Sequence, residues 1–320
     1  MFKINIAFMR PLFSRPRAAE LAAVNLYSDR AEVGHIRRNG SERPVVHVCA
    51  QFPDTGDPIE LLHRLRRELH LERFSCATLL PARQYQLQLI DAPNVPEAEM
   101  KSAVRWRLKD FLEYPVETAT VDVVAVPADQ TAVGRGRSVY AVSARNQDIE
   151  SRMKMFAKAK IPLRVIEVGE MAQRNLATLF EADHKALAML SFSEDGGLLT
   201  FTAQGELYLS RRIEISLDQL SGVRAEMRDQ LFERIALELQ RSLDHFDRQF
   251  SNVPLARLLL APLPDELGLA AYLAGNLSAP VESVDLGAVL DFHEVPELRE
   301  PAEQVMRWQT LGTALRVGTA

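Results

Sequence analysis

Alternating hydrophobic and polar residues near the start of the patterned region predict a meander of three strands. The first two are Leu21–Tyr27 and Arg30–Arg38, joined by a turn at Ser28-Asp29, and the third is Pro44–Cys49. Asn39-Gly40-Ser41 favours a hairpin between the second and third strands, because Asn and Gly tolerate positive φ.

The same arrangement starts again at Ala186. The strand pattern Ala186–Phe192 is followed by a turn at Ser193–Gly197, and Leu198–Ala203 and Glu206–Ile215 flank a tight turn at Gln204-Gly205. Two similar meanders, one at the head of each half, suggest an internal duplication.

Helical and strand patterns alternate between and after the meanders, which predicts an α/β protein. In the longest predicted helix, Val223–Phe250, apolar residues three and four positions apart share one face. Pro96 and Pro301 favour helix starts, since proline is tolerated in the first turn. The other predicted helices are Pro58–Leu69, Pro96–Leu112, Asn146–Ala159, Glu170–Phe180, Leu267–Leu277 and Ala302–Val317, and the other strands are Cys76–Leu80, Gln84–Ile90, Val121–Val126, Val139–Ser143, Leu163–Val168, Ala256–Leu260 and Pro280–Val284.

Length and charge narrow the possible classes of protein. A single core stops growing near ~250 residues, so the 320 residues of this chain predict two lobes. The formal net charge of -5 argues against a nucleic-acid partner. Cys49 and Cys76 form no CxxC pair, which excludes a zinc ribbon or a disulfide framework.

The N-terminal sequence MFKINIAFMRPLFSRPR lacks the apolar core and cleavage site of a signal peptide, and the chain contains no apolar stretch long enough to span a membrane. We therefore expect a cytoplasmic protein. Residues 1–17 mix hydrophobic side chains with cations, which suits peripheral contact with a membrane surface or a partner. A disordered chain end with a few apolar residues is the alternative.

The usual signatures of catalysis are absent from the sequence. No P-loop, GxGxxG, HExxH or GxSxG motif occurs, and the histidines do not cluster as metal ligands do. Gly134-Arg135-Gly136-Arg137 leads into no helix and favours a flexible loop within Ala128–Ser138. The residues alone thus predict a two-lobed α/β protein with no catalytic residue and no metal site.

Three segments carry a resemblance to a known family. They are Val104–Val116 (VRWRLKDFLEYPV), Leu237–Phe246 (LELQRSLDHF) and Leu311–Arg316 (LGTALR). They resemble the W-x-L-x-x-Y-x-P-F-P, E-I-Q-R-S-L-D-Y-F and A-x-G-L-A-L-R blocks of the PilM family of type IV pilus assembly proteins. The resemblance extends from about residue 20 to residue 317 and fits best the MshI branch, which serves the mannose-sensitive haemagglutinin (MSHA) pilus.

The resemblance implies an actin-like (ASKHA/ribonuclease H-like) duplicated two-lobe α/β fold, each lobe headed by a three-stranded β-meander. This agrees with the repeat found from the strand patterns. The implied organisation is an N-terminal tail (1–20), a first lobe (21–185) with an inserted subdomain at about 80–145, a second lobe (186–300), and a C-terminal helix (301–320) returning to the first lobe.

The resemblance also implies a nucleotide site, from which this chain departs. Active members carry Asp-x-Gly-[Ser/Thr] at the first turn of each meander, where glycine lets the backbone approach phosphates and a carboxylate helps to place Mg²⁺. Here the first turn reads Asn25-Leu26-Tyr27-Ser28, so Asn25 replaces the acid and Tyr27 the glycine.

The second and third nucleotide-site elements depart as well. The second turn, Leu190-Ser191-Phe192-Ser193, lacks the acid and places Phe192 near the glycine position, although Asp195, Gly196 and Gly197 follow closely. The family's Gly-Gly after a late strand is replaced by Ala261 and Pro262. Three coordinated departures predict a degenerate site without a cofactor, that is, a pseudo-ATPase.

The resemblance favours a scaffold for the inner-membrane platform of the pilus, in contact with other platform proteins. Family members bind the cytoplasmic tail of a PilN-like protein as an extended peptide in a first-lobe groove. Trp106, Tyr114, Pro115 and the strand Val121–Val126 are candidates for that groove, with a core or surface role as the alternative.

The alternative function is an active ATPase, and a more remote one is a sugar or acetate kinase, a class that shares the implied fold. In the ATPase alternative, Asp195, Gly196 and Gly197 would form a displaced phosphate loop for Mg-ATP, with Glu170 or Asp122 beside Mg²⁺. An ordinary turn explains the same three residues.

Overall fold

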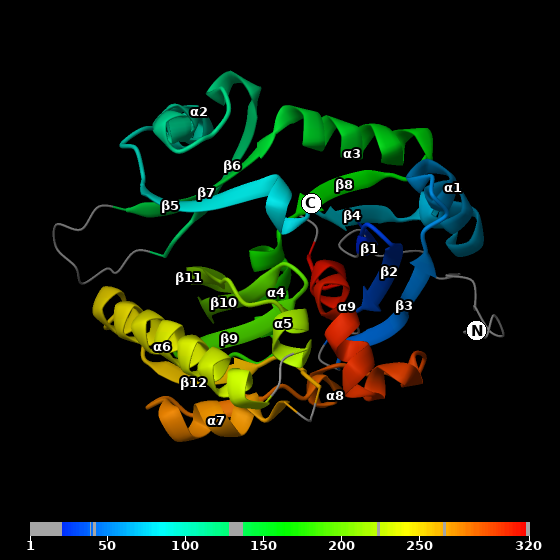
Figure 1. Ribbon diagram of the computed structural model, residues 1–320. Helices are drawn as coiled ribbons and strands as arrows, with labels where there is room; N and C mark the ends of the chain where they lie inside the picture. The colour runs from blue at the N-terminus through cyan, green and yellow to red at the C-terminus, as the bar shows by residue number, and fades with distance from the viewer. Residues whose placement is uncertain are drawn as a thin grey trace.

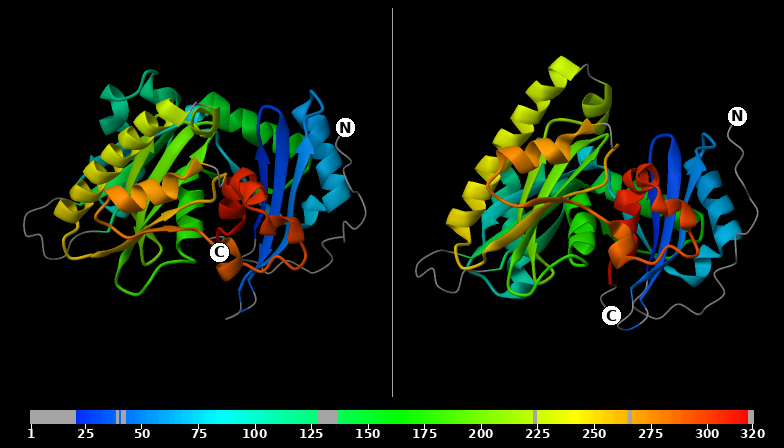
Figure 2. Two further views of the ribbon diagram at one scale, coloured as in Figure 1. Left: turned by 60° about the horizontal axis from the view of Figure 1, so that its bottom comes forward. Right: turned by 90° about the horizontal axis from the view of Figure 1, so that it is seen from below.

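The computed structural model describes residues 21–38, 40, 43–127, 137–222, 225–264 and 267–317, which form two lobes (Figures 1 and 2). The predictions for residues 1–17, for Asn39 and Ser41 of the predicted turn, for Gly134 to Gly136 and for Val223 therefore fall outside the described residues. No helix in these ranges combines the length and apolar character needed to cross a membrane.

The first lobe is built on a five-stranded sheet of order β3-β2-β1-β4-β8. Its first three strands form the predicted antiparallel meander, and β4 and β8 extend the sheet in parallel. Side chains of β1 alternate between two core clusters: Ala22 and Val24 pack with α1 and α3, and Ala23 packs with α9. The elements are β1 (Leu21–Leu26), β2 (Arg30–Arg37), β3 (Val45–Pro53), α1 (Pro58–Leu69), β4 (Ser75–Leu79), α3 (Asn146–Lys158), β8 (Leu163–Glu167), α4 (Gly169–Ala177) and α9 (Pro301–Ala314).

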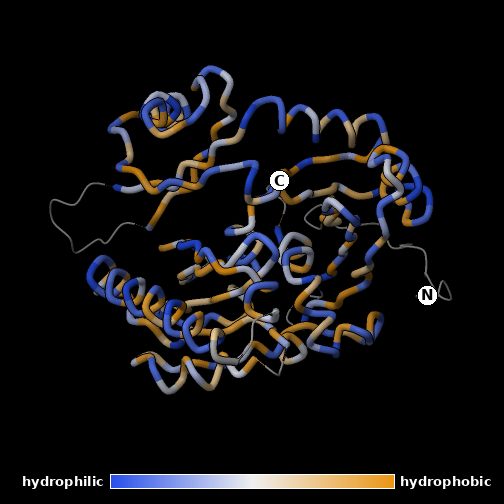
Figure 3. Tube along the Cα trace, viewed as in Figure 1, coloured by the Kyte–Doolittle hydropathy of each residue, from blue (hydrophilic) through white to orange (hydrophobic). Residues whose placement is uncertain are grey.

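The second lobe repeats this design with the sheet order β11-β10-β9-β12-β13. Ala188 and Leu190 of β9 pack toward α6 and α7, whereas Leu187 and Met189 share a core cluster with α4 and α9. Hydrophobic and hydrophilic segments alternate along α6 in Figure 3, as expected for a helix with one buried face. The elements are β9 (Ala186–Ser193), β10 (Gly196–Ala203), β11 (Glu206–Ile213), α5 (Leu217–Gly222), α6 (Ala225–Gln249), β12 (Leu255–Leu260), α7 (Leu269–Asn276), β13 (Val281–Ser283) and α8 (Leu286–Val289).

A smaller three-stranded antiparallel sheet of order β5-β7-β6 lies between β4 and α3 in the chain (Figure 1). One of its faces packs on α2 through a small apolar cluster that contains Val104, Leu108 and Ala141. Its elements are β5 (Tyr85–Asp91), α2 (Glu97–Arg107), β6 (Ala119–Ala125) and β7 (Ser138–Arg145), with 3-10 turns at Leu71–Arg73, Ala82–Gln84, Leu108–Asp110, Val116–Thr118 and Pro296–Arg299 elsewhere in the chain.

Helices α4 and α9 cross in close contact between the two sheets, and α9 lies between the lobes in Figure 2. At the crossing, a Cβ on Gly312 would lie 2.3 Å from the Ala172 carbonyl oxygen, so the helices meet without a side chain between them. The Asn175 side chain donates to the Gly312 carbonyl at 3.0 Å. The crossing ties the end of the first lobe to the C-terminal helix.

Element boundaries differ from the prediction mainly at helix ends. The predicted helix Pro96–Leu112 ends as an α-helix at Arg107 and tightens into a 3-10 turn, and the predicted Ala302–Val317 ends at Ala314. The short helices α5 and α8 were not predicted, because four to six residues are too few to show a helical period.

Candidate functional site

A cavity of about 410 Å³ opens between the lobes, where the two meander turns face each other. We call it the interlobe cavity. Of the residues predicted from the sequence, Gly197, Ala261 and Pro262 do not line it. Those that do line it are Asn25, Tyr27, Ser28, Phe192, Asp195 and Gly196.

Asn25 uses both ends of its amide inside the protein. The residue is 1% exposed; its Nδ2 donates to Thr310 Oγ1 of α9 at 3.0 Å, and its Oδ1 accepts from the Leu79 backbone N–H at 2.8 Å. Thr310 in turn donates to Glu32 Oε2 at 2.5 Å. A carboxylate at position 25 would have no hydrogen to donate to Thr310 and would lie near the Glu32 carboxylate. Asn25 thus joins β1, β4 and α9 through both ends of its amide.

Tyr27 lies in the wall of the cavity beneath a cation. The Arg30 guanidinium lies 4.3 Å from the Tyr27 ring centroid, and Arg30 Nε also donates to Glu32 Oε1 at 2.9 Å. Burial, reinforced by the charge of Glu32, raises the pKa of the Tyr27 phenol, which therefore stays neutral. An aromatic ring thus lines the cavity where the family's pattern has glycine.

The two glycines of the second meander are explained by chain geometry. Gly196 has φ +115, and a Cβ there would lie 2.8 Å from the Ile213 carbonyl oxygen. A Cβ on Gly197 would lie 2.9 Å from the ring of Phe192, which is buried. Asp195 is exposed, and its backbone N–H donates to Ser193 Oγ at 3.2 Å. These contacts fit a turn that needs small residues to pack against β11.

Glu170, proposed beside Mg²⁺ in the ATPase alternative, is hydrogen-bonded to side chains of two other elements. The residue is 1% exposed; its Oε1 accepts from Arg212 Nη2 at 2.7 Å and its Oε2 from Tyr85 Oη at 2.5 Å. Tyr85 Oη also accepts from the Gly169 backbone N–H at 3.1 Å. Burial and the neighbouring Glu170 carboxylate raise the pKa of Tyr85 well above its ordinary value. This group connects β5, the start of α4 and β11, and both carboxylate oxygens are occupied.

The remaining acidic candidate, Asp122, lies away from the cavity. Its side chain is largely exposed on β6 and forms an ion pair with Lys101 at 2.7 Å. Within the described ranges, no three His, Cys, Asp or Glu side chains gather in a way that could hold a metal ion. Of the acids named for the ATPase alternative, Asp122 thus lies outside the cavity and Glu170 is hydrogen-bonded to Arg212 and Tyr85, whereas Asp195 lines the cavity.

In the third predicted nucleotide-site element, Ala261 is part of the core and Pro262 is half-buried. The Ala261 backbone N–H donates to the Leu190 carbonyl at 2.8 Å, and its side chain packs in the cluster shared by α4 and α9. Ala261 thus continues the pairing of β12 with β9.

Of the residues predicted for partner binding, Trp106 lies on α2, and Tyr114 and Pro115 lie in the segment between α2 and β6. Trp106 is 63% exposed, and the Tyr114 ring packs under the Arg145 guanidinium at 4.2 Å. Pro115 presents its carbonyl to Thr118 Oγ1 at 2.7 Å. These residues do not form one site.

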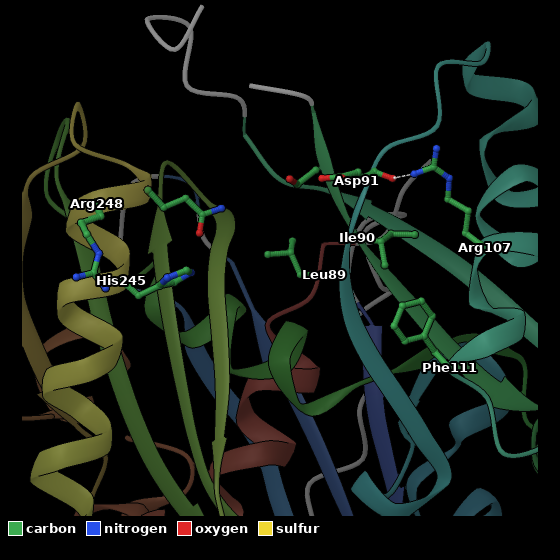
Figure 4. A pocket seen from close by; sticks show the side chains of 9 residues that line it. Leu89, Ile90, Asp91, Arg107, Phe111, His245 and Arg248 are labelled. Carbon is green, nitrogen blue, oxygen red and sulfur yellow. Dashed lines mark hydrogen bonds between the residues drawn. The ribbon is translucent and has the colours of Figure 1, made fainter. Parts of the chain in front are cut away.

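A groove of about 760 Å³ lies beside β5 (Figure 4). We call it the β5 groove. Leu89, 38% exposed, projects from β5 into the space facing His245 and Arg248 of α6. Trp106, Tyr114 and Pro115 do not line this groove, whereas two other residues of the same segment, Arg107 and Phe111, do. Its lining residues are Leu89, Ile90, Asp91, Arg107, Phe111, Ser138, His245, Arg248 and Gln249.

Comparison with protein-family models finds no match, and neither does comparison with curated protein sequences. Solved structures do match. A chain in a structure described as a PilM-PilN type IV pilus biogenesis complex is 18% identical at TM-score 0.69, with 94% of this chain and 98% of that chain covered. The cytoplasmic domain of EpsL, an inner-membrane component of the type II secretion system of Vibrio cholerae, is 15% identical at TM-score 0.48, with 92% and 94% covered. A protein of unknown function from Bacteroides thetaiotaomicron, described as having an actin-like ATPase fold, is 10% identical at TM-score 0.47, with 88% and 95% covered. The predicted fold class is confirmed: the chain has the actin-like ATPase fold, of the kind found in the PilM-PilN structure.

Proposed function

We propose that this protein is a non-hydrolysing scaffold of the inner-membrane assembly platform of a type IV pilus, where it binds the cytoplasmic tail of a PilN-like protein. The fold shared with the PilM-PilN structure supports the pilus role. The observation that carries the non-hydrolysing part is Asn25, whose amide joins Thr310 and Leu79 where an active member would present a carboxylate to Mg²⁺. The fold alone does not imply nucleotide hydrolysis, so this part of the proposal rests on the residues of the site.

The nucleotide part of this proposal is tested by a thermal melt. A ligand at ~1,000 times its Kd stabilises a protein by about 4 kcal/mol, so millimolar Mg-ATP would raise the Tm of a micromolar binder by several degrees. We expect no rise. The ATPase alternative has one observation in its favour, since Asp195 and Gly196 line the interlobe cavity. A rise that disappears in Asp195→Ala would establish that alternative instead.

For the partner, we propose docking in the β5 groove. β5 pairs with β7 on one side and with no described strand on the other, so its outer edge offers backbone groups to an extended peptide. Leu89 and Phe111 supply exposed apolar surface, and Arg107 and Arg248 supply positive charge. This combination suits an extended tail with alternating apolar and acidic residues.

A titration of the PilN-like tail peptide against purified protein tests this docking site. Loss of one apolar anchor is worth roughly 1.5–2 kcal/mol, so Leu89→Asp should weaken binding about tenfold or more. Leu237→Asp is the matched control, because Leu237 is equally apolar, exposed on α6 and absent from the groove lining. Equal affinities of the two variants would remove the β5 groove from the proposal, and no binding to the wild type would remove the partner.

We further propose that the pilus is of the MSHA type and that the protein lies on the cytoplasmic face of the inner membrane, with residues 1–17 contributing to peripheral attachment. The chain length and the departures from the nucleotide-site motifs support the first point, and the mixture of hydrophobic and basic residues supports the second. Deleting residues 1–17 should lower the membrane fraction in cell extracts, and MSHA platform proteins should copurify with the full chain. Unchanged fractionation, or copurification with another system alone, would contradict these two points respectively.

A further inference from the structure

Arg152 is a buried cation with too few partners. It lies on α3 with 6% of its surface exposed, and its Nη1 has no hydrogen-bond partner. Its Nη2 makes a long contact of 3.4 Å with Gln84 Oε1. No carboxylate among the described residues forms an ion pair with it. Burial lowers the pKa of its guanidinium, and the charge of Asp148, one turn earlier on α3, only partly opposes this. Buried charges in proteins are normally paired, so this one is poised for a counter-ion.

Arg152 and Gln84 line the same side of the interlobe cavity. Because Gln84 Oε1 accepts from Arg152, the Gln84 Nε2 group remains a donor beside the guanidinium. Three other arginines line the cavity. Arg30 is neutralised by Glu32, Arg212 is neutralised by Glu170, and Arg83 is exposed. Among these lining arginines, Arg152 is therefore the buried one that retains a free donor.

The opposite wall of the cavity is acidic. Glu194, Asp195 and Asp218 of the second lobe all line it. A ligand with several negative charges spread along its length, such as a nucleoside triphosphate, would be repelled there. A small molecule with one oxyanion group at one end would place that group on Arg152 and keep it away from these acids.

We propose that Arg152, with Gln84, forms a binding site for a single oxyanion group, a carboxylate or a phosphate, carried by a small molecule in the interlobe cavity. A planar guanidinium with a free N–H suits either group, because both offer paired acceptor oxygens. The site differs from the meander turns in its residues, which come from α3 and the 3-10 turn Ala82–Gln84. It is also independent of tail binding in the β5 groove.

Thermal melts of the full chain with inorganic phosphate or acetate, against sodium chloride at equal ionic strength, test the site. We expect a saturable rise in Tm with one of these anions. A rise with phosphate alone assigns a phosphate ligand, and a rise with acetate alone assigns a carboxylate. Arg152→Met should abolish the rise, and its Tm without anion should not fall, because an unpaired buried charge has been removed. Arg164→Gln, at an exposed arginine on β8 outside the cavity, should keep the full response.

A structural role for Arg152 gives the opposite pattern. In that case Arg152→Met lowers the Tm without anion, and any response to anion is as large as in the wild type, which would overturn the proposal. Absence of a response in the wild type would overturn it as well. Should Arg152→Met fail to fold, Arg152→Lys keeps the charge without the planar fork and should bind the anion about tenfold more weakly. Tail-peptide affinity is expected to be unchanged in these variants, which separates this result from the partner test.

Discussion

The two meanders place equivalent residues against different helices, and they do so with different chemistry. Asn25 and Ser191 each lie three residues before the two-residue turn of their meander, so they are structurally equivalent. Asn25 bonds to Thr310 of α9, and Ser191 donates to Gln173 Oε1 of α4 at 2.5 Å. Each lobe therefore uses the polar residue near its turn to hold a crossing helix.

The residue that faces each of these positions on the neighbouring strand differs between the two lobes. Glu32 pairs with Asn25 across β1 and β2, whereas apolar Leu198 pairs with Ser191 across β9 and β10. The first-lobe network contains a buried carboxylate bound by Arg30 and Thr310, while the second-lobe network is neutral. In both lobes the polar residue near the turn thus supports a crossing helix, through a network that contains a buried carboxylate in the first lobe and is neutral in the second.

The crossing of α4 and α9, on which both networks depend, should show the largest effect. In Gly312→Ala the new Cβ meets the Ala172 backbone, which cannot move without shifting α4, so we expect a loss of about 3 kcal/mol in the free energy of unfolding. Urea denaturation measures it. Gly275→Ala on α7 is the control: a Cβ there meets nothing within 4 Å, and this change should leave stability equal or slightly higher. Equal effects of both variants would show that the crossing tolerates separation.

Asn25→Asp should break the first-lobe network. The variant loses the donor to Thr310 and places a buried carboxylate near Glu32, so we expect a loss of about 2–3 kcal/mol at neutral pH. Burial raises the pKa of the new carboxyl, and the loss should therefore shrink as the pH falls and the group is protonated. Urea denaturation at two pH values checks this. Unchanged stability together with new Mg-ATP binding would instead mean that position 25 is still a nucleotide position.

The sequence predicted the local features of the fold and of the candidate site better than the contacts between residues far apart in the chain. The meanders were predictable because two-residue turns and strand alternation are local signals, and the substitutions at Asn25 and Tyr27 stand at a recognisable turn. The group formed by Tyr85, Glu170 and Arg212 was not predicted. Its members come from three elements far apart in the chain, and no spacing in the sequence connects them.

The same kind of reason applies to the residues predicted for partner binding. Trp106, Tyr114 and Pro115 were chosen from a continuous segment, but a helix and two 3-10 turns point its side chains in different directions. Arg107 and Phe111 of that segment line the β5 groove, together with residues of α6 that lie far away in the sequence. A resemblance identifies a segment, and only the packing shows which of its residues share a surface.

The loss of folding stability at acid pH should come mainly from the first lobe. His35 of β2 is equivalent to Phe201 of β10 by the same register, and both are buried. Burial, with the charges of His47 and Arg37, lowers the pKa of His35 to about 4, while Glu294 acts in the opposite direction. His35 is thus neutral in the folded protein, and its contribution is complete above the unfolded pKa of ~6.5 and is lost as the pH falls toward 4.

The lowered pKa of His35 corresponds to about 2 kcal/mol of lost stability between pH 7 and pH 5. His35→Phe, which copies the second lobe, should reduce the pH dependence of unfolding by about that amount. Urea denaturation across this range checks it, with His63→Phe on α1 as the control. His35→Phe with the pH profile of the wild type would place the acid sensitivity elsewhere.

The smallest effect is expected from the second-lobe network. Ser191→Ala removes the one hydrogen bond that Gln173 Oε1 accepts, while Gln173 Nε2 keeps the Met189 carbonyl and Thr200 Oγ1 as acceptors at 2.8 and 3.0 Å. We expect a loss of about 1 kcal/mol that does not change between pH 7 and pH 5, because no ionisable group takes part. Paired urea denaturation of Ser191→Ala and Asn25→Asp measures the difference. A loss as large and as pH-dependent as that of Asn25→Asp would show that the two lobes hold their crossing helices in the same way.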